Sequence, residues 1–395
     1  MLGLNLQQQN ADFQRLADSV TRSASKCLAL MFDKSSRLFS SAHTRRESGP
    51  NGEKVSSRDT LIALIGIHNL DETGAHSIVE TTESLAAIMD NGDWVQGIND
   101  IGLLLWACAI ISPESFVQVT KRWDLRLAFS RYSDARIGDT AALSVFLTGL
   151  SCLAIALPDT SRTTRELAFD AYRRIRMNQG SSGFFGHCSV TSSLWGRIAG
   201  EIGTFEDQAY ATYAITKFSE AYGNHRAVET ALDCALAICD AQGQLGQWWW
   251  RYDAPNGRIV TRFPVLSVHQ YGLGPMALLA LGEAIGSDFT PWVYKGLQWL
   301  EDNELRMDMM DESGQLISKG IRRTGSRKIW NGIVNVATGR EDREACTGLE
   351  LLPECRPRDL GWLLYALAPV RKRLPHQCTR ALTTAPEFGR GSVGQ

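Results

Sequence analysis

The chain has 395 residues, of which 44% are hydrophobic and 21% are charged, and its formal net charge at pH 7 is −2. This is the composition of a globular protein with enough apolar residues for a large core. Because Lys and Arg are scattered along the chain, the sequence argues against a nucleic-acid binder held by a basic surface. The longest apolar run, Ile101 to Ile111, is far shorter than the roughly 20 residues that cross a bilayer, so no transmembrane segment is expected.

The amino terminus and the cysteines predict a cytoplasmic protein. The first residues, MLGLNLQQQNADF, lack the charged segment and apolar stretch of a secretion signal. The nine cysteines are odd in number and include no CxxC pair, and several fall inside apolar helical runs. We therefore expect reduced thiols in a reducing compartment and no disulfide framework.

Taken in chain order, the apolar pattern predicts an almost entirely helical protein. Residues 12–40 have helical periodicity, and residues 42–57 are polar with Pro-Asn-Gly, which indicates a linker. From Asp59 onward, helices alternate with glycine-rich turns. The expected helices are 76–90, 97–111, 139–156, 162–177, 189–199, 207–222, 225–241, 267–284, 289–304 and 358–371.

Three other segments depart from the helical pattern. The stretch Arg258–Val265 alternates as a strand does. Residues 317–348 are basic and poorly periodic, which indicates an irregular excursion from the core. Residues 373–395 are polar and typical of a flexible tail. The predicted organisation is an N-terminal helical extension and linker over 1–56, a helical domain over 57–372 and the tail.

A recurring helix end is the clearest sign of internal organisation. The segments Gln179–Phe185 and Gln242–Trp248 both consist of Gln, three residues, Gly, one residue and an aromatic residue. A degenerate copy, Asp90–Trp94, keeps Gly-x-Trp but lacks the Gln. Copies spaced by tens of residues predict an array of helical hairpins. In each copy, glycine ends the helix in the left-handed conformation and the ring fills the gap between neighbouring hairpins.

This pattern resembles the QW-type repeat of the squalene cyclase and protein prenyltransferase toroids, over short pieces of residues 90–250. Six-hairpin glycosidases and sugar epimerases use the same ring of hairpins. The stretches Phe205–Tyr210, Gly246–Asp253 and Ser267–Gln270 look like helix starts and loops found among those proteins. The resemblance implies an all-α fold, a single α/α toroid of helical hairpins with minor β-strand content.

Polar and aromatic residues in the loops that precede inner helices are the pocket candidates, because these loops meet at one mouth of such a ring. The catalytic candidates are acids and one histidine near expected helix starts or turns: Asp93, Asp100, Asp207, Asp253 and His269. The substrate-binding candidates are the ring and amide side chains near them: Trp94, His187, Gln208, Trp248, Trp249, Trp250, Tyr252 and Gln270.

Each of these residues also has a purely structural interpretation. Asp253 suits a turn, Asp207 suits the positive end of a helix dipole, and His269 suits a cap or a core position. The three tryptophans of 248–250 suit wedges between hairpins as well as a cavity wall. Asp139 is favoured as a helix cap rather than as a catalyst.

The favoured function is a carbohydrate-active enzyme of glycoside hydrolase, lyase or epimerase type, acting on an oligosaccharide or glycoconjugate. Sugar sites pair aromatic platforms with carboxylates that protonate the leaving oxygen and activate water. The alternatives are an isoprenoid or terpenoid cyclase-like enzyme and a non-catalytic toroid that binds a peptide or glycan. The sequence has no DxDD acid motif and shows no metal set or cofactor motif, so no metal and no cofactor are predicted.

Overall fold

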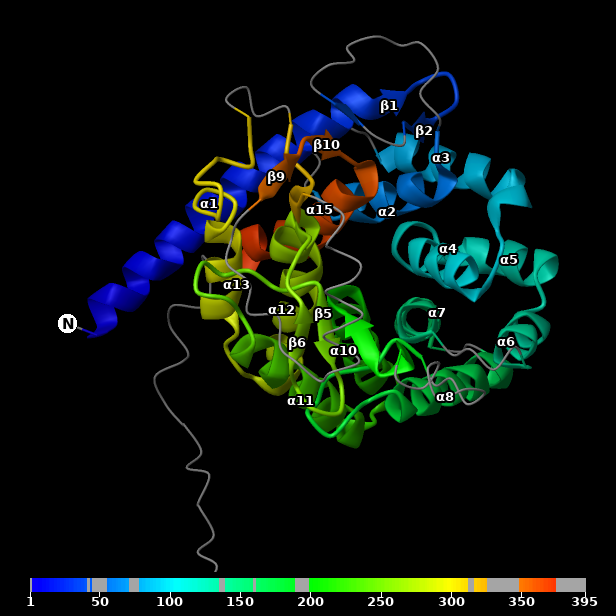
Figure 1. Ribbon diagram of the computed structural model, residues 1–395. Coiled ribbons are helices and arrows are strands. Elements are labelled where there is room, and N and C mark those ends of the chain that lie inside the picture. Colours follow the sequence, from blue (N-terminus) through cyan, green and yellow to red (C-terminus); the bar gives the residue numbers. More distant parts are fainter. Residues whose placement is uncertain are drawn as a thin grey trace, which may run out of the picture.

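The computed structural model describes residues 2–40, 43–44, 55–70, 78–134, 139–158, 161–188, 199–311, 316–324 and 348–373. Within these residues the helices form a ring (Figure 1). The inner helices, each packed against the next with the last packed against the first, are α2 (Ser57–His68), α4 (Ile98–Ile111), α7 (Thr140–Ala156), α10 (Phe205–Tyr222), α12 (Gly274–Ile285) and α15 (Pro357–Arg373).

A second layer of helices surrounds this ring. Each outer helix packs against one or more of the inner helices. The outer helices are α1 (Leu2–Met31), α3 (Ile78–Asp90), α5 (Phe116–Arg122), α6 (Leu125–Asp134), α8 (Arg162–Met177), α11 (His225–Asp240) and α13 (Thr290–Gln298). The predicted α/α toroid is therefore confirmed.

Helix α1 takes part in the ring as an outer helix. It packs along α15 and also contacts α13, although the sequence suggested an extension separate from the helical domain. Its apolar side chains explain the packing, because Phe13, Leu16 and Val20 repeat at helical spacing and are buried. In Figure 1 the first turns of α1 project away from the rest of the molecule.

The strands are short and antiparallel, in agreement with the predicted minor β content. Two pairs are formed by β1 (Phe32–Asp33) with β2 (Leu38–Phe39) and by β3 (His43–Thr44) with β10 (Glu354–Cys355). One three-stranded sheet consists of β4 (Ile202–Thr204), β5 (Arg251–Asp253) and β6 (Ile259–Thr261). The other consists of β7 (Val265–Leu266), β8 (Gly320–Arg323) and β9 (Leu349–Leu352).

Two predicted segments differ in detail from the structure. The expected strand Arg258–Val265 is divided between β6 and β7, with the cis peptide Phe263–Pro264 between them. The stretch 317–348 contributes β8, and its residues 325–347 lie outside the described residues, as do 374–395 and most of the expected helix 189–199.

The repeated helix end has the same geometry in both full copies. Gln179 donates through Nε2 to the carbonyls of Gly183 at 3.0 Å and Thr230 at 2.9 Å. Gln242 donates in the same way to Gly246 and Trp292, each at 3.0 Å. In each copy the side-chain amide connects its own turn to the next outer helix. This explains why both copies have Gln at the same position.

The glycine and the ring of the repeat are equally constrained. Gly183 and Gly246 have φ angles of +91° and +97°, a conformation that favours glycine. The rings that follow, Phe185 and Trp248, are fully buried. In the degenerate copy, Arg122 replaces the Gln by donating to the carbonyls of Met89 and Asp90.

Among the described residues, no helix combines the length and apolar character that crossing a bilayer requires. The seven cysteines in this part of the chain are all free thiols.

Candidate active site

All of the inner helices except α12 start with charged side chains, and several of these interact with one another. Asp59 opens α2, Asp100 opens α4, Asp139 caps α7, Glu206 and Asp207 open α10, and Arg358 and Asp359 open α15. Arg358 affects the pKa of both Asp59 and Glu206, which lie on different helices. The starts of these helices therefore share one mouth of the ring.

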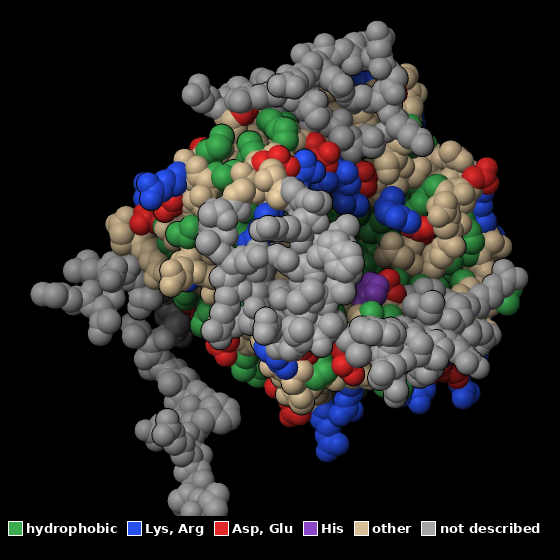
Figure 2. Space-filling model, in the orientation of Figure 1, with side chains coloured by type: hydrophobic (Ala, Val, Ile, Leu, Met, Phe, Trp, Pro, Cys, Tyr) green, Lys and Arg blue, Asp and Glu red, His purple; other side chains and the backbone are tan. Residues whose placement is uncertain are grey.

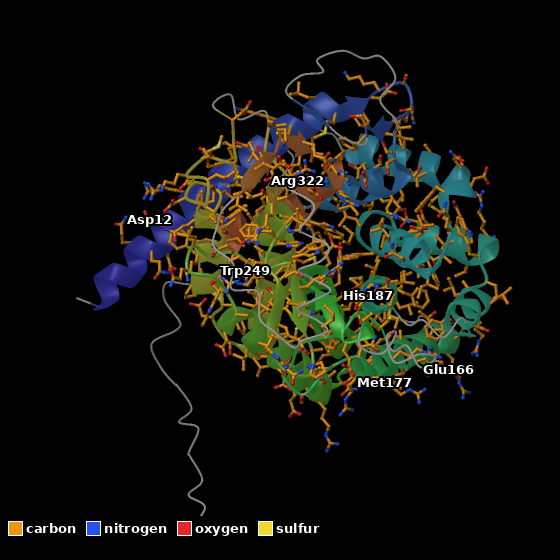
Figure 3. The ribbon with its side chains drawn as sticks, in the orientation of Figure 1. Asp12, Glu166, Met177, His187, Trp249 and Arg322 are labelled. Atoms are coloured by element: carbon orange, nitrogen blue, oxygen red, sulfur yellow. The ribbon has the colours of Figure 1, made fainter. Side chains whose placement is uncertain are left out.

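Asp139, His187 and Asp207 form a compact cluster at this mouth. One donor atom from each of the three lies within 4.8 Å of the other two. Figure 3 labels His187 near the starts of α7 and α10, and Figure 2 shows a histidine at that position beside an acidic side chain, at the edge of a hollow. The cluster joins two residues predicted from sequence, His187 and Asp207, to one that was favoured only as a cap.

Asp207 fixes the position of His187. Thr204 and Asp207 form a capping box at the start of α10, in which Asp207 Oδ2 accepts from the Thr204 amide at 2.8 Å and hydroxyl at 2.9 Å. The same oxygen lies 3.3 Å from His187 Nδ1, and the Asp207 side chain is 1% exposed. Because its oxygens are already engaged and buried, Asp207 suits a positioning role.

His187 is a cation over most of the neutral pH range. Its hydrogen bond to Asp207 raises the pKa of the imidazole to about 9, against the opposing effect of partial burial. The backbone of the same loop is tied to α7, since Thr140 N donates to His187 O at 2.7 Å. The imidazolium is therefore held rigidly, with Nε2 3.9 Å from Asp139 Oδ2.

Asp139 combines a structural contact with a reactive environment. Its Oδ1 accepts from the amides of Ala141 at 2.9 Å and Ala142 at 3.3 Å, which caps α7. Its Oδ2 faces His187, and the side chain stays 32% exposed. Burial raises the pKa of Asp139 in spite of the nearby imidazolium. A carboxyl group whose pKa is raised by burial and which still reaches solvent suits a general acid.

The donor set of this cluster fits an ion-pair network better than a metal centre. Asp207 already accepts hydrogen bonds from Thr204 and His187. Asp139 Oδ1 likewise accepts from the amides of Ala141 and Ala142. The carboxylates are therefore largely engaged within the protein, whereas catalytic zinc usually has three protein ligands.

Aromatic side chains from opposite sides of the ring close the lumen below the mouth. Trp106 of α4 stacks on Tyr213 of α10 with centroids 5.4 Å apart and packs against Trp362 of α15 at 4.8 Å. Tyr365 accepts a hydrogen bond from Trp106 and lies 2.6 Å from the Tyr213 hydroxyl oxygen. These rings form an aromatic floor, so the lumen is not open from end to end.

Asp100, another predicted acid, opens α4 in a closed environment. Its side chain is 2% exposed and pairs with Arg58 at 2.6 Å. It also accepts from the Gln96 amide at 3.0 Å. Asp100 therefore ties α4 to α2 at the mouth.

Asp253, Asp93 and Trp94 do not join the cluster. Asp253 closes a turn by accepting from the Asn256 amide at 3.2 Å. Asp93 is exposed in the short helix Gly92–Trp94, and Trp94 donates to the Ile88 carbonyl at 3.2 Å.

The two predicted glutamines support the repeat. Gln208 accepts from the Phe185 amide at 2.6 Å and donates to the Phe185 carbonyl at 2.7 Å. Gln270, with its amide oriented to satisfy its neighbours, donates to Gly246 O at 3.0 Å and accepts from Trp248 N at 3.2 Å. Both side chains are fully buried.

The tryptophan run faces three directions. Trp248 is fully buried and stacks on Phe205, while Trp250 is half-buried and stacks on His269. Trp249 lines a cavity of about 820 Å³ together with Arg262, whose guanidinium lies 4.7 Å from the indole centroid. The predicted Tyr252 accepts from the Trp249 amide at 2.8 Å and is fully buried.

His269 lies in the π-helical segment His269–Leu273 and is fully buried between Phe205 and Trp250. Neither ring nitrogen has a hydrogen-bond partner among the described residues. Burial lowers the pKa of this imidazole to about 3 from the ordinary 6.5.

This burial predicts an acid-sensitive fold. In the unfolded chain His269 is protonated below about pH 6.5, whereas in the folded chain it stays neutral down to about pH 3. The free energy of unfolding therefore falls as the pH drops from 6.5 to 3. At pH 5 the loss is about 2 kcal/mol, since one pKa unit corresponds to about 1.4 kcal/mol. Urea unfolding at pH 7.5 and pH 5 measures it. Between these pH values, the free energy of unfolding of the His269→Phe variant should fall by about 2 kcal/mol less than that of the unmodified protein. An equal fall in both proteins would contradict the prediction.

No family model and no curated protein matches the chain. Solved structures do match it. An unsaturated glucuronyl hydrolase from Bacillus sp. GL1, described as responsible for the degradation of glycosaminoglycan, superposes with a TM-score of 0.59 at 14% identity, covering 90% of this chain and 97% of that chain.

Two further neighbours have similar scores. A possible member of the GH105 family from Salmonella enterica serovar Paratyphi A gives a TM-score of 0.58 at 10% identity, covering 91% of this chain and 95% of that chain. A variant unsaturated glucuronyl hydrolase from Streptococcus agalactiae, complexed with dGlcA-GalNAc6S, superposes with a TM-score of 0.55 at 13% identity. The match covers 90% of this chain and 91% of that chain. The fold is thus the α/α toroid of these glycoside hydrolases.

Proposed function

We propose that the chain is a carbohydrate-active enzyme of the hydrolase type, which cleaves an oligosaccharide at the mouth of its toroid. The observation that carries the proposal is the arrangement of Asp139, His187 and Asp207 above an aromatic pocket floor. Structural neighbours that act on glucuronyl oligosaccharides support it, because they have the same ring of helices.

The residues of the cluster divide the chemistry among them. Asp139, whose pKa is raised by burial, acts as the general acid and donates a proton to the leaving oxygen of the bond that breaks. The carboxylate left behind is stabilised by the imidazolium of His187, 3.9 Å away. Water supplies the hydroxyl group of the new sugar end and returns a proton to Asp139. Asp207 takes no part in the proton transfer and holds His187 in place.

The isoprenoid cyclase alternative has weaker support. Protonation of an alkene needs one acid in an apolar cavity, and the aromatic floor would suit a cation. The mouth, however, brings together carboxylates from α7 and α10 with charged neighbours from α15. A polar rim over aromatic rings is typical of a sugar site.

A turnover screen tests the proposal. The purified protein is incubated with unsaturated glucuronyl disaccharides derived from glycosaminoglycans and with uncharged oligosaccharides, and the products are identified by mass spectrometry. The expected result is cleavage of at least one class. Tight binding without cleavage of any member would instead support the non-catalytic alternative, and neither binding nor cleavage would argue against a sugar site.

A further inference from the structure

Besides Asp139 and Asp207, a third acidic residue, Glu206, faces the lumen of the ring. It precedes Asp207 at the start of α10, but its charge interacts with Arg358 and Asp359 of α15 and with Asp139 of α7. Within the ring, α10 is flanked by α7 and α12, so an interaction with α15 crosses the lumen.

One helical turn below Glu206, side chains of α10 and α15 also meet across the lumen. Tyr210, one helical turn further along α10, packs edge-on against Trp362 of α15, with ring centroids 5.8 Å apart. Trp362 follows Arg358 by one turn on α15. Glu206 and Arg358 therefore lie at the level above the Tyr210–Trp362 contact, nearer the mouth.

The carboxyl group of Glu206 is available to a ligand. It has neither a hydrogen bond nor an ion pair with a described residue, and it is half-buried. Arg358 does not neutralise it directly, because the guanidinium is 3.4 Å from Asp359 and also interacts with Asp59. Burial raises the pKa of Glu206, as expected for a carboxyl group without a close partner.

We propose that Glu206 contacts the sugar held in the lumen and makes the site selective for an uncharged or amino sugar over a uronic acid. The proposal rests on the proposed function and names the substrate class of that same site. A carboxylate accepts charge-assisted hydrogen bonds from sugar hydroxyls or from an ammonium group. A second carboxylate brought close to it is repelled, and Arg358 is already shared among three acids.

Binding of three matched monosaccharides tests this selectivity. Glucose, glucosamine and glucuronate are titrated against the full-length protein at pH 8, which favours the ionised form of Glu206, and dissociation constants are measured by saturation-transfer NMR. The unmodified protein should bind glucose or glucosamine at least about tenfold more tightly than glucuronate. In Glu206→Gln this preference should fall to about twofold or less, mainly through tighter binding of glucuronate.

A matched variant on the same helix is the control. Glu220 lies on α10 with its side chain 48% exposed and pairs with Lys217, so Glu220→Gln should leave the preference unchanged. Thermal unfolding of both variants checks that they fold. A preference for glucuronate in the unmodified protein, or an unchanged preference in Glu206→Gln, would overturn the assignment of Glu206. Absence of binding by all three sugars, together with no cleavage in the turnover screen, would instead count against the proposed function itself.

Discussion

Replacing Asp139 by Asn is expected to lower kcat/KM for a cleaved oligosaccharide by about 10²–10⁴-fold, the usual contribution of a general acid. The substitution removes the proton that Asp139 supplies and keeps the shape of the side chain. Asn is as good a helix cap as Asp, so the bonds to the Ala141 and Ala142 amides should survive and the fold should be unchanged. Initial rates on the substrate found in the turnover screen measure the effect.

Asp170→Asn serves as the control for this prediction. Asp170 is on the outer helix α8, pairs with Arg173 and has a side chain that is 42% exposed. This variant should retain full activity. If kcat/KM of Asp139→Asn stays within about threefold of that of the unmodified protein, with an unchanged melting temperature, Asp139 is not the general acid.

Replacing Gly66 by Ala is expected to destabilise the protein by about 3 kcal/mol, the upper part of the usual range for overpacking. Gly66 is on α2 and faces Gly361 on α15, where the first and last inner helices meet. A Cβ at Gly66 would lie 2.2 Å from the Gly361 carbonyl oxygen, and one at Gly361 would lie 2.4 Å from the Ile62 carbonyl oxygen. Because both contacts are with backbone, the helices must separate. Urea unfolding gives the change in free energy.

Gly97→Ala is the comparison at a position without such contacts. A Cβ at Gly97 would meet nothing within 4 Å, so the change should stay within about 1 kcal/mol. Equal stability of Gly66→Ala and Gly97→Ala would show that α2 and α15 do not close the ring as described.

The helical hairpins could be predicted from sequence because their signals are local. Apolar periodicity and the Gln-to-ring repeat predicted 162–177 and 225–241, and the structure has α8 and α11 at these positions, to within one residue. The position of α1 could not be predicted, because its packing against α15 joins opposite ends of the chain. No local pattern records such a contact.

The site was only partly visible in the sequence for a related reason. His187 and Asp207 of the proposed site were selected from the sequence because one follows a repeat ring and the other opens a helix. Asp139 was correctly expected to cap a helix, but the cap uses only Oδ1 of the carboxylate, and Oδ2 faces His187. The position of Oδ2 opposite His187 depends on the hydrogen bond that Thr140 N donates to His187 O, which is a tertiary contact. Glu206, which we propose as a sugar contact, was not selected from the sequence, because a helix start gives no sign of which acid faces the lumen.

The position at which a sugar binds is the most direct test of the proposed site. A crystal structure of Asp139→Asn soaked with the oligosaccharide that the unmodified protein cleaves would show this. We predict electron density for a sugar ring above Tyr210 and Trp362, within hydrogen-bonding distance of residue 139 and of His187. Density only in the cavity beside Trp249, with the lumen empty, would contradict the account.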